Sequence, residues 1–273
     1  MINLIIYPSD VEDNHVIDDL FTFESTLANK YGSAVALINY DEFKLMEKDL
    51  AVTFLTEQPE YPCTAVYRGF PLTPERYNSL YEHLKLIGIK LINNPTEYAN
   101  THHFNNSYEK LMNCTPKIAV FNGDEIIDWD EVRDYFHNKF IIKDFDLRNE
   151  IFDFTYTDKQ LDARVAEFKE FYYKYRGIVI LQEYVEIQRK FKALYYKGRL
   201  IAVNSLDKSN KEEIKQVKKF AEHLPKLDSH FYALELALTS DNKLIVLNSV
   251  DGQYCESSSI DWCETLYEKL FSK

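Results

Sequence analysis

The chain has little of what marks disulfide-stapled, zinc-binding or membrane-spanning proteins. Its 273 residues include four cysteines, Cys63, Cys114, Cys255 and Cys263. No two of them form a Cys-x-x-Cys pair, and none has a histidine partner at zinc-ligand spacing. No apolar run approaches membrane-spanning length, and the N-terminus lacks the basic start and the apolar length of a signal peptide. We therefore expect a cytoplasmic protein with reduced thiols.

Basic charge is also scarce. There are 32 Lys and Arg against 44 Asp and Glu, which gives a formal net charge of −12. This balance argues against broad nucleic-acid binding, because that affinity comes from neutralising phosphates with Lys and Arg. Gly (7) and Pro (8) are few, and no repeat or low-complexity segment is present. What remains is a normal globular composition, 45% hydrophobic, in a chain long enough to bury a sizeable core as one large domain or two ordinary ones.

Strands alternate with helices over the first 92 residues. The apolar spacing predicts helices over 11–31 and 73–88, and strands over 2–7, 34–38, 52–55, 64–70 and 89–92. The second helix has a clear start, with Thr73 as N-cap, Pro74 at the first helical position and Glu75 in the first turn. This alternation predicts a small α/β layer domain.

The rest of the chain is richer in strands. A turn and a short helix follow Asn93, then a polar cluster at 100–108 and a charged connector at 146–157. We expect strands over 117–121, 139–146, 178–184, 190–196, 199–206, 231–238 and 243–249, and helices over 129–137, 158–175, 211–224 and 259–271. A mostly polar run before Pro116 predicts a division into residues 1–115 and 116–273.

Three groups of residues, in this order and spacing, resemble the ATP-grasp superfamily. They are 67–70 with 91–97, then 140–144, and finally 182–186 with 251–253. The resemblance runs from about the fourth predicted strand to the end. More narrowly, the chain is similar to compact bacterial and phage ATP-grasp proteins, and its Asn-, Lys-, Ile- and Tyr-rich usage fits an AT-rich genome. The resemblance implies an N-terminal α/β (pre-ATP-grasp) domain before two α+β lobes that grip Mg-ATP.

Two segments are candidates for binding the nucleotide. Lys143 lies near the end of an apolar strand, and the resemblance implies that it touches the α- and β-phosphates. Glu183, Tyr184, Val185 and Glu186 would form a hinge, because an exposed strand end offers unpaired N–H and C=O groups to the adenine edge. In that hinge, Glu186 is the better candidate to accept hydrogen bonds from the ribose. The alternatives are a lysine facing solvent and an ordinary strand end with solvated acids.

The candidate metal ligands lie further along. Glu235 stands inside an apolar strand, where a carboxylate needs a cation or a metal as partner. The family expects a second carboxylate near the end of the last strand; this chain has Asn248 there, and Asp251 could supply the missing charge. Lys190 and Lys192 stand where related proteins tend to carry Glu-x-Arg, and can meet a phosphate without the bidentate fork of arginine. Their alternative is a solvated strand face.

Three further positions could carry chemistry. Arg68 lies at a strand end just before Gly69, where its guanidinium could hold a substrate carboxylate or phosphate, or could form a structural ion pair. His102 and His103 are adjacent, so both cannot face one site, and exposed polar histidines are the simpler interpretation. Nucleophilic roles for the four cysteines are disfavoured.

The sequence thus predicts an ATP-dependent carboxylate–amine ligase that uses Mg²⁺ and an acyl-phosphate intermediate. Its substrates would be small-molecule or peptide carboxylates and amines, with no nucleic-acid or membrane partner. A kinase that stops at the phosphorylated substrate is a close variant. The alternative is a non-catalytic nucleotide- or protein-binding module, because Asn248 and Lys192 depart from the family pattern. An acidic interaction protein that binds no nucleotide is a third possibility.

Overall fold

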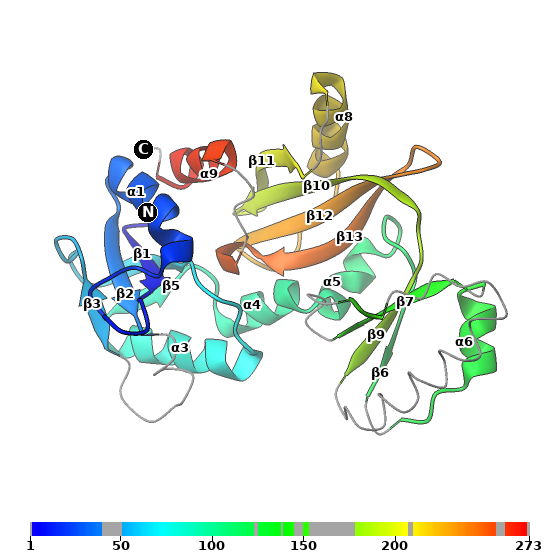
Figure 1. The fold of residues 1–273 in the computed structure, drawn as a ribbon, viewed down its shortest axis with the longest axis horizontal. Helices are drawn as coiled ribbons and strands as arrows, with labels where there is room; N and C mark the ends of the chain where they lie inside the picture. Colours follow the sequence, from blue (N-terminus) through cyan, green and yellow to red (C-terminus); the bar gives the residue numbers. More distant parts are fainter. Residues whose placement is uncertain are drawn as a thin grey trace.

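Three β-sheets form the framework of the protein. The computed structural model describes residues 2–39, 51–122, 125–137, 139–144, 150–152, 178–206, 210–254 and 260–271. Figure 1 shows the first sheet at one end of the molecule, the second at the other end, and the third above and between them. The chain visits the sheets in that order, so the first sheet is complete before the other two begin.

The first sheet is a mostly parallel layer with helices on both faces. Its strand order is β3-β2-β1-β4-β5, with bounds Val52–Phe54, Ala34–Ile38, Leu4–Pro8, Cys63–Tyr67 and Ile89–Leu91. All pairs are parallel except β2–β3. One face packs on α3 (Pro74–Leu86), and the other on α1 (Thr22–Lys30) and α9 (Ile260–Phe271). The small α/β domain predicted from alternating strands and helices is present.

The predicted helix at 11–31 is too long. A 3-10 turn, η1 (Asp19–Phe21), precedes α1, and residues 11–18 form turns. In this stretch the side chains of Asp10, Asp13 and Asp18 each accept a hydrogen bond from the backbone N–H two residues further on, at 2.8–2.9 Å. Such local bonds compete with helical ones, so the acidic residues that favour turns delay the helix.

The second and third sheets are antiparallel. The second has the order β6-β9-β7-β8 and packs on α6 (Trp129–Tyr135); its strands are Ile118–Phe121, Val179–Glu183, Phe140–Asp144 and Glu150–Phe152. The third has the order β11-β10-β12-β13, with strands Arg199–Ser205, Ile187–Tyr196, Phe231–Thr239 and Leu244–Asp251. Helix α8 (Lys211–Glu222) covers one face of the third sheet. Strand β8 falls within the predicted connector, and the helix predicted at 158–175 lies outside the described residues.

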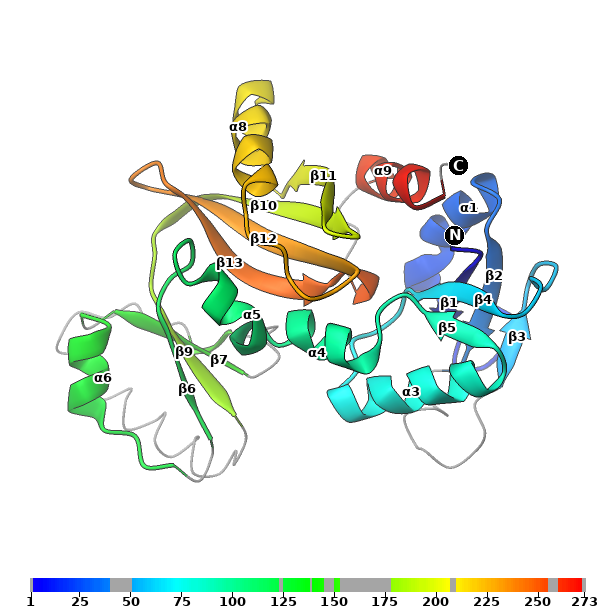
Figure 2. The ribbon, with the colours of Figure 1, turned by 180° about the vertical axis from the view of Figure 1, so that it is seen from behind.

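Two short helices join the first sheet to the others. They are α4 (Pro95–His102) and α5 (Phe104–Leu111), and both run beside β13 (Figure 2). Asn94 and Glu97 form a capping box that starts α4. The cluster predicted as polar at 100–108 is therefore largely helical, and His102 and His103 are buried rather than exposed. His102 stacks on Tyr98, with ring centroids 4.5 Å apart.

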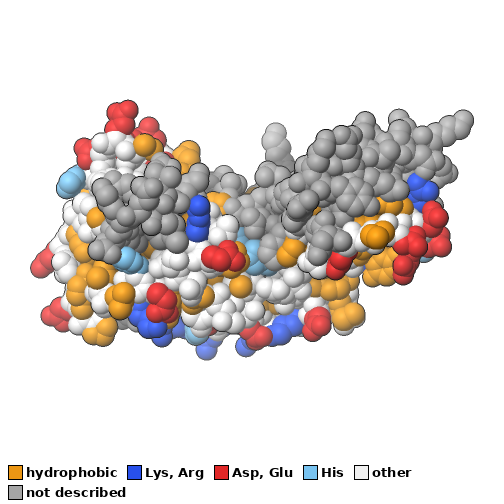
Figure 3. Space-filling model, turned by 90° about the horizontal axis from the view of Figure 1, so that it is seen from below, with side chains coloured by type: hydrophobic (Ala, Val, Ile, Leu, Met, Phe, Trp, Pro, Cys, Tyr) orange, Lys and Arg blue, Asp and Glu red, His pale blue; other side chains and the backbone are white. Residues whose placement is uncertain are grey.

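The two ends of the chain meet. After β13, the 3-10 turn η2 (Gly252–Tyr254) leads toward α9, which packs beside α1, so the N- and C-termini lie at the same end of the molecule (Figure 1). Within the described residues, no helix has the length and apolar character needed to cross a membrane. Acidic, basic and apolar side chains are interspersed over the described part of the face in Figure 3.

Candidate functional site

A three-residue linker connects the second sheet to the third. Strand β9 ends at Glu183, Tyr184 to Glu186 are not in a strand, and β10 begins at Ile187. The N–H of Tyr184 donates to the carbonyl of Lys139 at 3.1 Å, and the carbonyl of Glu186 accepts from the N–H of Ser240 at 3.0 Å. Between these two anchors, no described residue hydrogen-bonds to the backbone of Val185. The predicted hinge thus offers an unpaired backbone edge between two sheets.

The two acidic side chains of this linker differ in their surroundings. The carboxylate of Glu183 accepts a hydrogen bond from the N–H of Lys117 at 3.2 Å, which ties it to the start of β6. Glu186 is exposed. Glu186 is therefore the carboxylate that a ligand at the linker could reach more readily, and its role at the ribose stays a prediction.

Three predicted site residues lie side by side on one face of the third sheet. Lys192 in β10 is the cross-strand partner of Glu235 in β12, and Glu235 is the partner of Asn248 in β13. Direct partners in an antiparallel pair have Cβ atoms about 4.5–5.5 Å apart. Lys192 and Asn248 are buried, and Glu235 is half-buried. The sheet therefore brings a cation, a carboxylate and an amide into one row.

The amide oxygen of Asn248 is an orphan in this row. Asn248 is 5% exposed, and its Oδ1 has no hydrogen-bond partner in the part of the chain that the structure describes. A buried polar atom without a partner costs about 1–3 kcal/mol. An amide oxygen beside a carboxylate is a donor set that suits Mg²⁺, which prefers oxygen ligands. Within the described residues, no group of three His, Cys, Asp or Glu could hold a metal.

The structure gives less information on the other two predicted phosphate ligands, Lys190 and Lys143. Lys190 lies two residues before Lys192 on β10, so both are on the same face of the strand, and Lys190 is exposed. Lys143 belongs to β7, where it pairs with Ile180 of β9. The side chain of Lys143 lies outside the described residues, so its role stays a prediction.

Asp251 lies on the opposite face of the third sheet from Glu235 and Asn248. It is three residues beyond Asn248 on the same strand, and side chains alternate between faces. Its buried carboxylate accepts hydrogen bonds from Asn93 Nδ2 at 2.5 Å and from the N–H and Nε2 of Gln253 at 2.9 and 3.2 Å. Burial raises the pKa of Asp251 to about 7. The structure thus corrects the expectation that Asp251 adds its charge to the metal ligands.

Arg68 is held in a buried ion pair. Its guanidinium donates to both carboxylate oxygens of Glu24, at 2.5 and 3.1 Å, and to the carbonyls of Gly252 and Gln253 at 2.9 and 3.0 Å. Glu24 also accepts a short hydrogen bond from Tyr267. With 3% of Arg68 exposed, this geometry matches the structural alternative and leaves no open fork for a substrate carboxylate.

Two buried amides that were not predicted as site residues hold the sheets together. Gln182, at the end of β9, donates from Nε2 to the carbonyl of Leu247 in β13 at 3.1 Å. Asn93, after β5, pairs with both the carbonyl and the N–H of Phe231, at 2.6 and 3.0 Å. A polar amide at the end of the apolar run Val-Ile-Leu was the available signal for Gln182.

Comparison with solved structures identifies the architecture. D-alanyl-alanine synthetase A from Vibrio cholerae matches with a TM-score of 0.61 and 14% identity, covering 98% of this chain and 97% of that one. A D-alanine–D-alanine ligase from Bacillus anthracis complexed with ATP matches with a TM-score of 0.58 and 13% identity, covering 99% of this chain and 98% of that one. The ATP-grasp ligase PsnB, complexed with a minimal precursor, Mg and ADP, matches with a TM-score of 0.59 and 13% identity, covering 98% of this chain and 96% of that one.

The chain therefore has the ATP-grasp fold, as the sequence resemblance predicted. No protein-family model matches the sequence, and no curated protein sequence matches it. The likeness lies in the fold, which extends over nearly the whole of each chain. The division at 115/116 stays a prediction, and α9 packs back on the first sheet.

Proposed function

We propose that this protein is an ATP-dependent carboxylate–amine ligase that binds Mg-ATP between its second and third sheets. The observation that carries the proposal is the row of Lys192, Glu235 and Asn248, in which a buried amide oxygen has no partner among the described residues. The ATP-grasp fold supports it, because its solved neighbours are ligases, one with bound ATP and one with Mg and ADP.

The linker would bind the base and the sugar of the nucleotide. The unpaired backbone of Val185 can exchange hydrogen bonds with the adenine edge, and the exposed Glu186 can accept from the ribose hydroxyls. From there the phosphates would extend along the face of the third sheet toward Lys190 and Lys192. Lysine suits this role as a point charge with three donors. Lys143, on the facing lobe, is the proposed third phosphate ligand.

Glu235 and Asn248 would hold Mg²⁺ together with phosphate oxygens. Their carboxylate and amide oxygens are ligands of the kind that Mg²⁺ takes, and Mg²⁺ usually relies on one or two carboxylates plus phosphates and water. When bound, the ion neutralises charge on the phosphate oxygens. Lys192, directly opposite Glu235, would keep a fixed positive charge beside the same phosphates.

The proposed reaction has two transfers. A substrate carboxylate oxygen attacks the γ-phosphorus of ATP, the bond to the ADP oxygen breaks, and an acyl phosphate forms. A substrate amine then attacks the acyl carbon, inorganic phosphate leaves, and the nitrogen loses a proton as the amide forms. The chain's share is positioning and charge stabilisation by Lys192, Lys190 and Lys143.

One observation favours a non-catalytic module as the second candidate. Glu235 is the one carboxylate in the row and Lys192 stands directly opposite it, so the three side chains of the row together carry no net negative charge. Such a site would bind a nucleotide already complexed with Mg²⁺ and would not need to turn it over.

Measuring ADP release tests turnover directly. The full chain would be incubated with Mg-ATP alone and with pooled amino acids, peptides or a cell extract. A ligase releases ADP faster when its substrates are present, and Lys192→Met should remove that stimulation while the protein stays folded. Mg-ATP binding without stimulation by any pool would favour the non-catalytic module and would overturn the ligase.

A further inference from the structure

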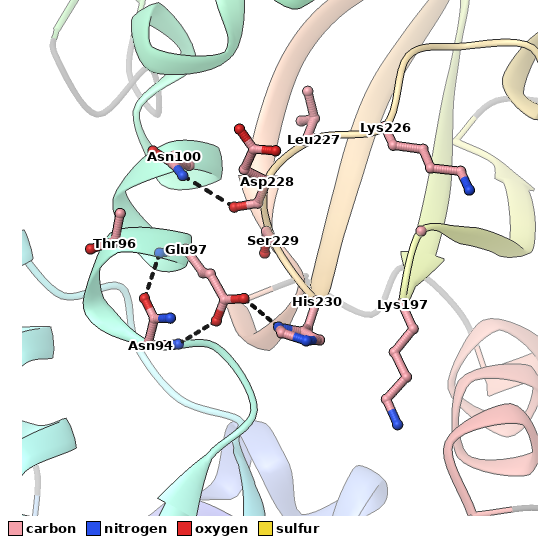
Figure 4. A pocket seen from close by; sticks show the side chains of 11 residues that line it. Asn94, Thr96, Glu97, Asn100, Lys197, Lys226, Leu227, Asp228, Ser229 and His230 are labelled. Atoms are coloured by element: carbon pink, nitrogen blue, oxygen red, sulfur yellow. Dashed lines mark hydrogen bonds and ion pairs between the residues drawn. The ribbon is translucent and has the colours of Figure 1, made fainter.

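An open pocket lies on the protein at a distance from the nucleotide face. It has a volume of about 680 Å³, and it is formed by the start of α4, the β10–β11 turn and the loop before β12 (Figure 4). This is within the 300–1,000 Å³ range of ligand pockets. Its polar lining residues are Asn94, Thr96, Glu97, Asn100, Lys197, Lys226, Asp228, Ser229 and His230.

The position of the pocket separates it from the proposed ATP site. Lys197 and His230 are hydrogen-bonded neighbours at the ends of β10 and β12 that lie away from the linker, whereas Ser240 joins the linker at the other end of β12. Glu235 follows His230 by five positions, which is about 16 Å along a strand. His230 lies just before β12 begins and contacts Glu97 of α4, whereas Glu235 lies in the middle of that strand.

Both carboxylates of the pocket are already engaged. Glu97 accepts the N–H of Asn94 at 2.8 Å as part of the capping box, and its other carboxylate oxygen contacts Nδ1 of His230. Figure 4 shows the Glu97 side chain directed at the His230 ring. Asp228 forms an ion pair with Lys110 at 2.6 Å. Neither carboxylate therefore needs a bound cation as a partner.

The two lysines of the pocket, in contrast, have no carboxylate partner among the described residues. Lys197 and Lys226 are exposed and form no ion pair with any described residue, and the Nζ of Lys197 lies 5.1 Å from the centroid of the Tyr196 ring. The stem of Lys226 passes over Gly198, whose φ of +69° and missing side chain let the lysine lie against the turn. The Nδ2 of Asn94 also has no partner among the described residues, since its Oδ1 alone serves the cap. Open donors beside satisfied acceptors select an acceptor-rich, negative ligand.

We propose that this pocket binds a small anionic molecule through its phosphate or carboxylate oxygens. Lys197 and Lys226 supply the charge, and Asn94 adds a directed N–H. The protein as a whole carries a formal charge of −12, and at this pocket two lysines bring positive charge that no described carboxylate neutralises. Because α4 follows the first sheet and His230 leads into the third, the ligand would bridge these two parts.

Calorimetric titration of the full chain with inorganic phosphate, and separately with citrate, tests the proposal. We expect saturable 1:1 binding of at least one probe; binding of phosphate points to phosphorylated ligands, and binding of citrate alone to carboxylates. The double variant Lys197→Gln/Lys226→Gln should weaken binding at least tenfold. Both lysines are exposed, so the variant should fold, and its thermal midpoint would show this.

The matched control is Lys85→Gln/Lys243→Gln, which removes the same charge at exposed positions on α3 and the β12–β13 turn. It should leave binding unchanged, as should saturation with a non-hydrolysable ATP analogue. No saturable binding of either probe, equal loss in both double variants, or competition by the analogue would overturn the proposal. If the chain binds no ATP, the phosphate and citrate titrations without the analogue still test whether the pocket binds an anion.

Discussion

At the scale of single residues, Asn248 sets the charge of the proposed metal site. Replacing it with aspartate would place a second carboxylate beside Glu235, at a position whose Oδ1 has no described partner. We expect Asn248→Asp to lower the Mg²⁺ concentration needed for half-maximal ATP binding roughly tenfold, which is about 1.4 kcal/mol. ATP titrations at a series of Mg²⁺ concentrations measure this.

A control for the added charge is Asn78→Asp, on the exposed face of α3. It should leave the Mg²⁺ dependence of ATP binding as in the wild type. An unchanged Mg²⁺ dependence in Asn248→Asp would show that Asn248 does not lie at the metal.

Asp251 gives the molecule a pH dependence of known sign. Burial raises its pKa to about 7 in the folded protein, against an ordinary value of 3.8, so the folded state holds a proton that the unfolded state releases between these values. The stabilisation is complete below pH 3.8 and is lost as the pH rises through 7. At about 1.4 kcal/mol per pKa unit, roughly 3 kcal/mol should disappear between pH 5 and 8.

The comparison with Asp251→Asn isolates this effect. The asparagine does not titrate, although its NH₂ group faces the donors Asn93 and Gln253 and costs stability at every pH. Urea unfolding at pH 5 and at pH 8 gives the difference in free energy between the two proteins. The advantage of the wild type should shrink by roughly 3 kcal/mol at the higher pH; a difference that stays constant would contradict the buried, proton-binding carboxyl.

At the scale of elements, one side chain fastens β9 to β13 across the proposed cleft. The Nε2 of Gln182 donates to the carbonyl of Leu247, and Gln182 is 2% exposed. Gln182→Met keeps the volume but leaves that carbonyl without its donor, so we expect a loss of about 1–3 kcal/mol in the free energy of unfolding. Urea denaturation of this variant and of Gln188→Met, at an exposed position on β10, should show a loss in the first alone.

Short apolar runs made the strands predictable. The strand expected at 34–38 is β2, and the strand expected at 199–206 ends one residue early. The start of α3 was equally clear, because Thr73 and Pro74 act locally. The start of α1 was not, because aspartate side chains bond to nearby N–H groups in turns that an apolar pattern does not register. Helix starts could therefore be predicted where the local capping residues agreed with the apolar periodicity of the sequence.

The site was predictable in part, for reasons of register and distance. That Lys192, Glu235 and Asn248 share a row depends on strand pairing, which no single strand encodes. The expectation that Asp251 joins the metal ligands could have been avoided. Asp251 follows Asn248 by three residues, and an odd spacing along a strand puts two side chains on opposite faces. The partner of Arg68 could not have been predicted, since Glu24 lies 44 residues earlier and gives no local signal.

At the scale of the whole molecule, one ion pair joins the beginning of the chain to its end. Arg68 binds Glu24 of α1 and the carbonyls of Gly252 and Gln253, while Tyr267 of α9 donates to the same glutamate. Arg68→Gln would leave Glu24 as a buried charge without its cation. We expect a loss of about 3–5 kcal/mol in the free energy of unfolding, measured by urea denaturation.

The exposed pair Lys30–Glu264 joins the same two helices and serves as the control. Lys30→Gln should cause no resolvable loss of stability, because solvent screens an exposed pair. If the two variants lose the same stability, the buried pair does not fasten the ends of the chain.

The central claim is that Mg-ATP binds on the face that carries Glu235. Calorimetry of Mg-ATP with the wild type, Glu235→Gln and the exposed control Glu82→Gln tests it most directly. We predict saturable 1:1 binding by the wild type and by Glu82→Gln, and at least tenfold weaker binding by Glu235→Gln. No binding by the wild type, or equal binding by Glu235→Gln, would contradict the claim.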